Sequence, residues 1–74
     1  MIWITVESSQ ISEVGYESDT RILGIRFKTG TEYRYHNVDA DTHKHLLAAE
    51  SIGKYFSSII KAYPQRFPFR KVEA

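Results

Sequence analysis

The sequence predicts an α+β fold: about four strands in an antiparallel β-meander, followed by two helices packed on one face of the sheet. Residues 2–36 hold four short segments in which apolar and polar side chains alternate, the period-two pattern of half-buried strands. Residues 40–63 instead repeat apolar side chains every three or four positions, as an amphipathic helix does. Strands that all precede the helices, instead of alternating with them, are typical of the α+β class.

The length of 74 residues allows one domain with a small hydrophobic core. Hydrophobic residues make up 42% of the chain and aromatic residues 14%, which supplies the apolar area that such a core needs. The absence of cysteine excludes disulfides, thiolate nucleophiles and thiolate-bound zinc. The apolar start turns polar at Glu7 and is too short for a signal peptide or a membrane span, so we expect a cytoplasmic protein without a membrane partner.

The expected strands cover residues 2–6, 11–16, 21–28 and 31–36. The loop length of the hairpin between residues 21–28 and 31–36 can be predicted, because it decides which side chains of the two strands share one face of the sheet. A two-residue loop would place Tyr33 and Tyr35 with the charged residues of the preceding strand. A three-residue loop, with Gly30 at positive φ, places both tyrosines with the apolar residues of that strand. The second choice gives one continuous apolar face, so we expect the tyrosine rings to lie in the core.

The expected helices begin at residues whose side chains can cap them. Asp39 can cap a helix over residues 40–50, and Ser51 a second helix that Pro64 ends. The second helix carries one apolar stripe, at positions 52, 55, 56, 59, 60 and 63. Residues 65–74 form a C-terminal tail. Because its sequence Phe67-Pro68-Phe69 is too apolar for a linker, we expect residues 65–71 to pack back on the domain as an extended segment.

The net charge of +1 hides an uneven distribution. Residues 1–50 carry five basic and eight acidic side chains, whereas residues 51–74 carry five basic and one acidic. In this last third, basic and aromatic side chains are interleaved, which suits phosphate groups and the faces of bases. The alternative interpretation is a solvated helix face followed by a soluble tail.

We expect no metal, no cofactor and no catalysis. Two of the three histidines, His43 and His45, lie two positions apart on a predicted helix, where their side chains diverge and cannot bind one metal together. Residues 51–54 and 58–61 both match the Ser-x-x-Lys spacing of some acyl-transfer enzymes. No accompanying catalytic element is present, and a cap and a surface residue explain the two serines better.

Residues 51–54 are a candidate anion site because they begin the second helix beside basic residues. Free backbone N–H groups and the missing side chain of Gly53 would let an anion approach closely. Alternatively, Gly53 permits tight packing of the helix against its neighbours.

Several short elements of the chain resemble the KTSC domain, which is named for its position at the C-terminus of some lysyl-tRNA synthetases. They are Ser8-Ser9-x-Ile11, Val14-Gly15-Tyr16, Leu23-x-Ile25-x-Phe27, Gly30-x-x-Tyr33-x-Tyr35, Val38, Ser51-x-Gly53-x-Tyr55-Phe56 and Ile60. The resemblance runs from about residue 8 to 63 and implies the small stand-alone form of the family, for which RNA binding is the usual suggestion. The chain departs from the family pattern at Asp39, where proline is common, and at Ser57, where asparagine is common.

We therefore expect a non-catalytic binding module for a phosphate-bearing ligand, with RNA as the first candidate. The residues expected to contact the ligand are Tyr33, Arg34, Tyr35, Ser51, Gly53, Lys54, Lys61, Arg66 and Arg70. Exposed tyrosines would form a stacking platform for bases, whereas buried tyrosines would leave recognition to the charged residues. Two other functions remain open: a small protein–protein adaptor or homo-oligomer that uses the tail or Trp3, and sequestration of a small nucleotide signal by a phage-type anti-defence protein.

Overall fold

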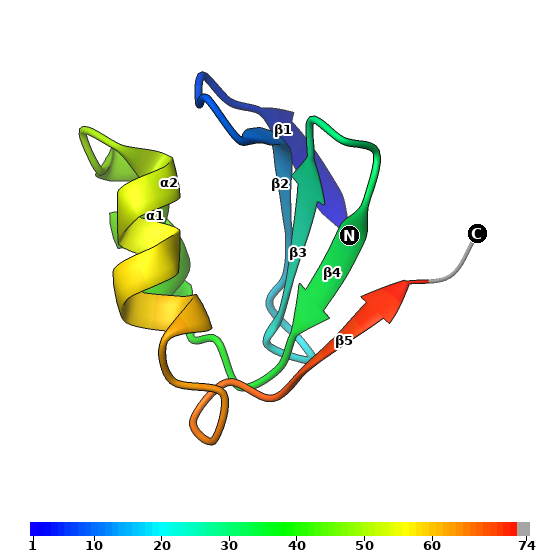
Figure 1. The fold of residues 1–74 in the computed structure, drawn as a ribbon. Helices are drawn as coiled ribbons and strands as arrows, with labels where there is room; N and C mark the ends of the chain where they lie inside the picture. Colours follow the sequence, from blue (N-terminus) through cyan, green and yellow to red (C-terminus); the bar gives the residue numbers. More distant parts are fainter. Residues whose placement is uncertain (73–74) are drawn as a thin grey trace.

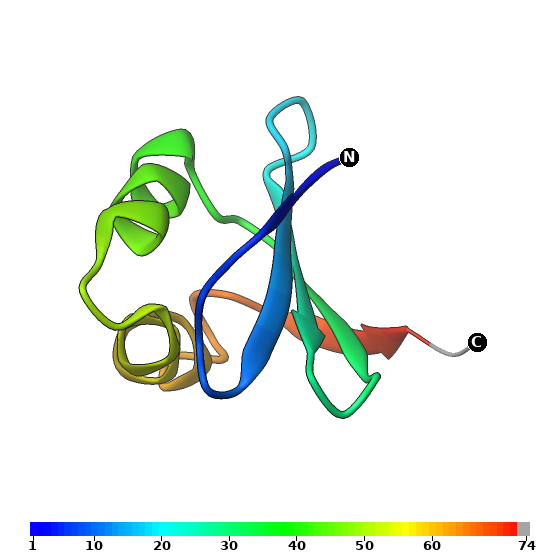
Figure 2. The ribbon, with the colours of Figure 1, turned by 90° about the horizontal axis from the view of Figure 1, so that it is seen from above.

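The computed structural model describes residues 1–72 as an antiparallel sheet with helices on one of its faces (Figures 1 and 2). The sheet has five strands, which lie in sequence order: β1 (Ile2–Thr5), β2 (Ile11–Glu17), β3 (Ile22–Phe27), β4 (Glu32–Tyr35) and β5 (Phe69–Val72). Between β4 and β5 the chain forms α1 (Ala40–Ala48), α2 (Ile52–Tyr55) and the π-helix η1 (Phe56–Lys61), which continues α2. The predicted α+β meander with helices on one face is confirmed.

The C-terminal tail adds the strand that the sequence did not identify. Phe67 is buried in the core, and the backbone N–H of His36 donates to the carbonyl oxygen of Pro68 at 2.7 Å. From there β5 pairs antiparallel with β4, with Phe69 opposite Tyr35. The sequence led us to expect an extended segment over residues 65–71, but residues 64–67 form a turn and only Phe69–Val72 are extended. The last two residues of the tail, 73–74, lie outside the described part of the chain.

The hairpin between β3 and β4 has the predicted three-residue loop. The N–H of Phe27 donates to the carbonyl oxygen of Thr31 at 2.8 Å, which leaves residues 28–30 as the loop. Gly30 has a φ of 94°, a conformation that residues with a side chain rarely adopt. Tyr33 then lies opposite Ile25, and its ring faces the core as expected.

The second helix departs from the prediction after its first turn. Only Ile52–Tyr55 are α-helical, and the π-helical segment ends at Lys61 instead of Tyr63. A π-helix has more residues per turn than an α-helix, so successive residues are rotated by a smaller angle about the helix axis. Part of the expected apolar stripe therefore faces away from the core. Ile59 is 41% exposed and Tyr63 55% exposed. The buried residues of the second helix are therefore four apart: Ile52, Phe56 and Ile60.

Both predicted helix caps are confirmed. The side chain of Asp39 accepts a hydrogen bond from the N–H of Thr42 at 2.8 Å, and the hydroxyl of Ser51 accepts one from the N–H of Lys54 at 3.3 Å. These bonds satisfy backbone donors that have no partner within the helix.

None of the helices within residues 1–72 has the length and apolar character to span a membrane.

The core lies between the sheet and the helices. Its buried residues come from β2, β3, β4, the helices and the tail: Ile11, Val14, Leu23, Ile25, Tyr35, Val38, Leu46, Ile52, Phe56, Ile60 and Phe67. No helix within residues 1–72 covers the opposite face of the sheet, which is called the outer face below (Figure 2).

Candidate functional site

A pocket between the β1–β2 turn and the second helix collects hydroxyl groups around one ammonium group. It encloses about 250 Å³ and is lined by Ser9, Gln10, Ser51, Gly53, Lys54, Ser57 and Ser58. We call it the serine pocket. Among the described residues, its lining carries one basic side chain and no carboxylate or imidazole. The lysine ammonium, the serine hydroxyls and the glutamine amide can all donate hydrogen bonds, and the hydroxyls and the amide can also accept them.

Backbone hydrogen bonds hold both walls of the serine pocket. The hydroxyl of Ser8 accepts from the N–H groups of Gln10 and Ile11, each at 3.3 Å, and this fixes the turn. The N–H of Lys28 donates to the carbonyl oxygen of Gln10 at 2.8 Å and ties the turn to the β3–β4 hairpin. On the other wall, Ser51 caps the helix. The pocket is therefore built from two restrained segments that lie about forty residues apart in the sequence.

Gly53 leaves its part of the pocket open. A Cβ atom at this position would lie 3.4 Å from the hydroxyl oxygen of Ser8, an ordinary van der Waals contact. Close packing therefore does not require glycine here, and of the two interpretations of Gly53 the structure favours free access to the backbone. Within residues 1–72, no hydrogen bond occupies the hydroxyl groups of Ser9, Ser57 or Ser58.

The structure does not bring all of the predicted ligand-contacting residues onto one surface. Ser51, Gly53 and Lys54 meet in the serine pocket, and Lys61 lies exposed on η1 outside that pocket. Arg66 lines a separate hollow of about 330 Å³ formed by residues 62–66.

The remaining four predicted residues belong to the sheet. Arg34 and Arg70 lie on its outer face. Tyr35 is only 3% exposed, and burial raises the pKa of its hydroxyl to about 12. Its ring is therefore not available to a ligand, because the helices cover it. Tyr33 is half-buried, with its ring centroid 5.9 Å from those of Phe27 and Phe69. The alternative of a tyrosine stacking platform is thus not realised.

Sequence reasoning missed four lining residues of the serine pocket: Ser9, Gln10, Ser57 and Ser58. One signal was present, because residues 51, 54 and 58 are spaced to share one side of a helix. Nothing in the sequence indicated that the turn at residues 8–10 lies against this side.

Trp3 covers two glycines on the outer face of the sheet. Ideal Cβ atoms at Gly15 and Gly24 would lie 2.7 and 2.5 Å from carbon atoms of its ring, so only glycine allows the ring to lie this close. The guanidinium carbon of Arg26 lies 3.7 Å from the ring centroid, a cation–π contact. Trp3 is therefore a packed residue of this face.

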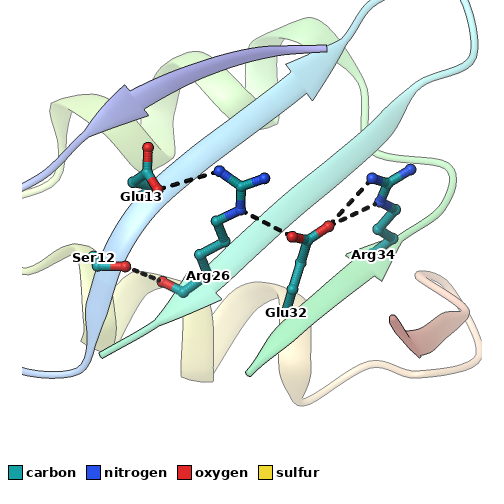
Figure 3. A network of polar contacts seen from close by, with 5 residues as sticks. All are labelled: Ser12, Glu13, Arg26, Glu32 and Arg34. Carbon is teal, nitrogen blue, oxygen red and sulfur yellow. Dashed lines mark hydrogen bonds and ion pairs between the residues drawn. The ribbon is translucent and has the colours of Figure 1, made fainter. Parts of the chain in front are cut away.

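A network of ion pairs crosses the outer face (Figure 3). It includes Arg26, the residue whose guanidinium lies over Trp3. Arg26 donates to Glu13 at 3.2 Å and to Glu32 at 2.9 Å. The Nε–H of Arg34 donates to the other carboxylate oxygen of Glu32 at 3.2 Å, and Nη2 of Arg34 forms an ion pair with the same oxygen at 3.2 Å. The hydrogen bond from Arg26 and, after it, that from Arg34 lower the pKa of Glu32, against the opposing effect of burial. Glu32 is the central acceptor of the network.

Glu32→Gln should lower the free energy of unfolding at pH 7 by about 1 kcal/mol, because amide groups bind two guanidinium groups less strongly than a carboxylate does. The effect lies at the low end of the usual range because the side chains of Arg26 and Arg34 are 39% and 41% exposed, so that solvent screens their charges. Since folding lowers the pKa of Glu32, its contribution is complete above the unfolded pKa of about 4.3 and is lost as the pH falls through the folded pKa.

Urea unfolding measured from pH 7 to pH 3 tests this. The wild-type protein should lose more stability than the variant over that range, and parallel curves for the two proteins would show that Glu32 contributes no pH-dependent stability.

The histidines are not gathered into a metal site. The ring of His43 stacks on Tyr16 with a centroid distance of 4.4 Å, and burial lowers the pKa of His43. The hydroxyl of Tyr16 donates to the carbonyl oxygen of Val38 at 2.6 Å, so the same pair packs α1 against the sheet. Within residues 1–72, no three histidine or carboxylate side chains come close enough to hold a metal ion.

The chain is thus a small two-layer α+β domain with a polar, lysine-containing pocket beside the first turn of its second helix. Residues 7–63 match the model of the KTSC domain family, which covers more than half of the chain. The protein belongs to the KTSC domain family, as its sequence elements indicated.

Similar proteins include both short chains and one long enzyme. A crystal structure of a KTSC domain protein from Yersinia pestis superposes with a TM-score of 0.88 at 33% identity and covers 97% of both chains. An uncharacterized protein of Stutzerimonas stutzeri is 30% identical over 70 residues, which is 95% of this chain and 96% of that protein. A lysine–tRNA ligase of Trichormus variabilis is 40% identical over 55 residues, which is 74% of this chain but 10% of the ligase.

Proposed function

We propose that this KTSC domain is a non-catalytic module that binds a phosphate-bearing ligand in the serine pocket, and that the ligand is RNA. The observation that carries the proposal is the composition of the pocket. Lys54 supplies a positive charge, three serine hydroxyls have no partner within residues 1–72, and Gly53 leaves the backbone accessible. A phosphodiester needs such donors around its oxygen atoms, and the absence of a lining carboxylate avoids repulsion.

Two observations favour RNA over a free nucleotide. A volume of about 250 Å³ lies below the usual range for pockets that enclose a whole small molecule, about 300–1,000 Å³. The pocket therefore suits one phosphate group of a larger molecule whose other parts lie along the surface. The similarity to a segment of a lysine–tRNA ligase supports a nucleic acid as that larger molecule, since tRNA is named as that enzyme's substrate. The hydroxyl of Ser51 caps the helix by accepting a hydrogen bond from the N–H of Lys54, which supports a structural role for this serine over that of a nucleophile.

Lys54→Glu should weaken RNA binding at least about tenfold and reduce its salt dependence, because it removes a phosphate contact and adds a repelling charge. Fluorescence anisotropy with labelled single-stranded RNA and tRNA, at about 50 and 200 mM salt, measures both effects. Lys44→Glu is the matched control, because Lys44 is exposed on α1 outside the pocket and the change in charge is the same.

Equal losses in the two variants would show that only the net charge matters, and would contradict a site in the serine pocket. Lys61→Glu, on η1 outside the pocket, should give an intermediate loss if RNA extends along the second helix. A thermal-shift series with mononucleotides completes the test, since stabilisation by them without binding of RNA would favour sequestration of a small nucleotide.

A homo-oligomer is the second candidate, and it is favoured by strand β1. Ile2 is 78% exposed and Ile4 44% exposed on this edge strand, which carries no charged side chain or proline to prevent pairing with another copy. Trp3 and Phe67 are less available for such a contact, since Trp3 covers glycines and Phe67 is buried, whereas Phe69 of the tail is 51% exposed. Light scattering distinguishes a dimer, which Ile4→Lys should dissociate, from a monomer.

A further inference from the structure

Two arginines lie directly opposite each other on the outer face of the sheet. Arg34 of β4 and Arg70 of β5 are partners in the antiparallel register of these strands. Directly opposed residues project to the same face, with Cβ atoms about 4.5–5.5 Å apart. Their chain neighbours Tyr35 and Phe69 form the next pair and project toward the helices, which places both guanidinium groups on the side away from the serine pocket.

The ion-pair network neutralises this arginine pair only in part. Arg34 uses Nε and Nη2 for a single oxygen atom of Glu32, and the second oxygen of Glu32 accepts from Arg26. Arg70 is exposed and makes no ion pair within residues 1–72. The carboxylate of Glu32 is thus shared between Arg26 and Arg34. Within residues 1–72, the end of the outer face at β4 and β5 therefore keeps an excess of positive charge.

Glu17 is the other carboxylate near Arg34, and the field of Arg34 contributes to its lowered pKa. Its carboxylate, however, accepts a hydrogen bond from the hydroxyl of Thr20 at 2.7 Å, which is the largest cause of that shift. Its other carboxylate oxygen lies 3.7 Å from the N-terminal amino group of Met1, and within the described part of the chain no hydrogen bond or ion pair joins Glu17 to Arg34 or Arg70. Like charges directly opposite on neighbouring strands destabilise a sheet, so a bound anion would relieve a repulsion that is present in the free protein.

We propose that Arg34 and Arg70 together bind one phosphate group on the outer face, at a site separate from the serine pocket. Glu32 orients the Arg34 guanidinium and leaves its Nη1 group available, and no side-chain donor of Arg70 has a partner within residues 1–72. Guanidinium groups bind phosphate oxygens through paired hydrogen bonds, and two of them a few ångströms apart can share one phosphate. The phosphate could belong to an RNA backbone or to a free nucleotide, and the experiment separates these sources.

The test follows the Nε–Hε signals of the arginine side chains by NMR while inorganic phosphate is added to the full chain. The signals of Arg34 and Arg70 should shift along saturable curves, whereas those of Arg21 and Arg66, which are exposed elsewhere, should stay nearly constant. Arg70→Gln should abolish the saturable shift of Arg34, and the control Arg66→Gln should leave it unchanged. Equal, non-saturating shifts in all exposed arginines would overturn the proposal, because they would report ionic strength alone.

Two further arms identify the source of the phosphate and separate this site from the serine pocket. If RNA supplies the phosphate, Arg70→Gln should weaken binding of an RNA oligonucleotide several-fold. If a free nucleotide supplies it, Arg70→Gln should leave oligonucleotide binding unchanged and abolish only the shifts of the arginine NMR signals that mononucleotides cause. Lys54→Glu should leave the phosphate response of Arg34 and Arg70 intact. If the arginine signals respond to phosphate but Lys54→Glu does not weaken RNA binding, the serine-pocket proposal alone is contradicted. If the wild-type protein shows no saturable response of Arg34 and Arg70 to phosphate but its RNA binding depends on Lys54, the outer-face proposal alone is overturned.

Discussion

Phe56→Ala should lower the free energy of unfolding by about 3–5 kcal/mol, because it removes a large ring from the centre of the core. Phe56 is 1% exposed, and its ring centroid lies 5.2 Å from that of Tyr35 and 5.8 Å from that of Phe27. The cavity would therefore open where the second helix meets the sheet. Since a domain of this kind has a total stability of about 5–15 kcal/mol, the variant should be close to unfolding at 37 °C.

Tyr63→Ala is the matched control for Phe56→Ala. Both residues belong to the apolar stripe that an uninterrupted α-helix would bury, but Tyr63 is 55% exposed. Its replacement should therefore change the free energy of unfolding by less than about 0.5 kcal/mol. Urea unfolding followed by circular dichroism measures both variants. Comparable losses would mean that the helix keeps α-helical winding to Tyr63, contrary to the π-helical segment of the structure.

The features that the sequence predicted correctly depend on neighbouring residues. Alternation of side chains identifies the first four strands because a strand exposes alternate residues to opposite faces. The hairpin loop follows from Gly30 and from the face of Tyr33, and the helix caps follow from Asp39 and Ser51. Each of these is decided within a few residues, where the local conformational preferences are strong.

The features that the sequence missed depend on residues far apart in the chain. Phe67 is buried in the core, and this places the following residues beside β4, where they form β5. No local sequence pattern specifies β4 as the strand with which they pair. The same pairing sets Arg70 against Arg34, so basic residues that are close in sequence separate onto opposite sides of the sheet. Likewise, Ser9 reaches the second helix only through the fold of the sheet. Clustering of charge along a chain therefore does not establish clustering on a surface.

Gly24→Ala should lower the free energy of unfolding by about 1–3 kcal/mol, because the added methyl group has no room. This is the opposite of the usual effect in a strand, where glycine is destabilising relative to alanine. The added Cβ atom would lie 2.5 Å from a ring carbon of Trp3 and 2.9 Å from the sulfur of Met1. The ring of Trp3 is also held by Arg26, so it cannot move aside without losing the cation–π contact. Gly53→Ala provides the control, because its Cβ atom would meet only the hydroxyl of Ser8 at 3.4 Å and alanine favours a helix by up to about 1 kcal/mol.

A double-mutant cycle with Trp3→Ala shows whether the clash is the cause. Trp3→Ala alone should be destabilising, because it exposes the backbone at Gly15 and Gly24 and leaves Arg26 without its aromatic partner. In that background Gly24→Ala has no ring to displace, so it should be neutral or stabilising, with a coupling energy of about 1–3 kcal/mol between the two positions. An equal cost of Gly24→Ala in both backgrounds would mean that Trp3 does not lie over Gly24. The outer face would then lack its only aromatic lining among residues 1–72, and Arg26 would be oriented by its carboxylate partners alone.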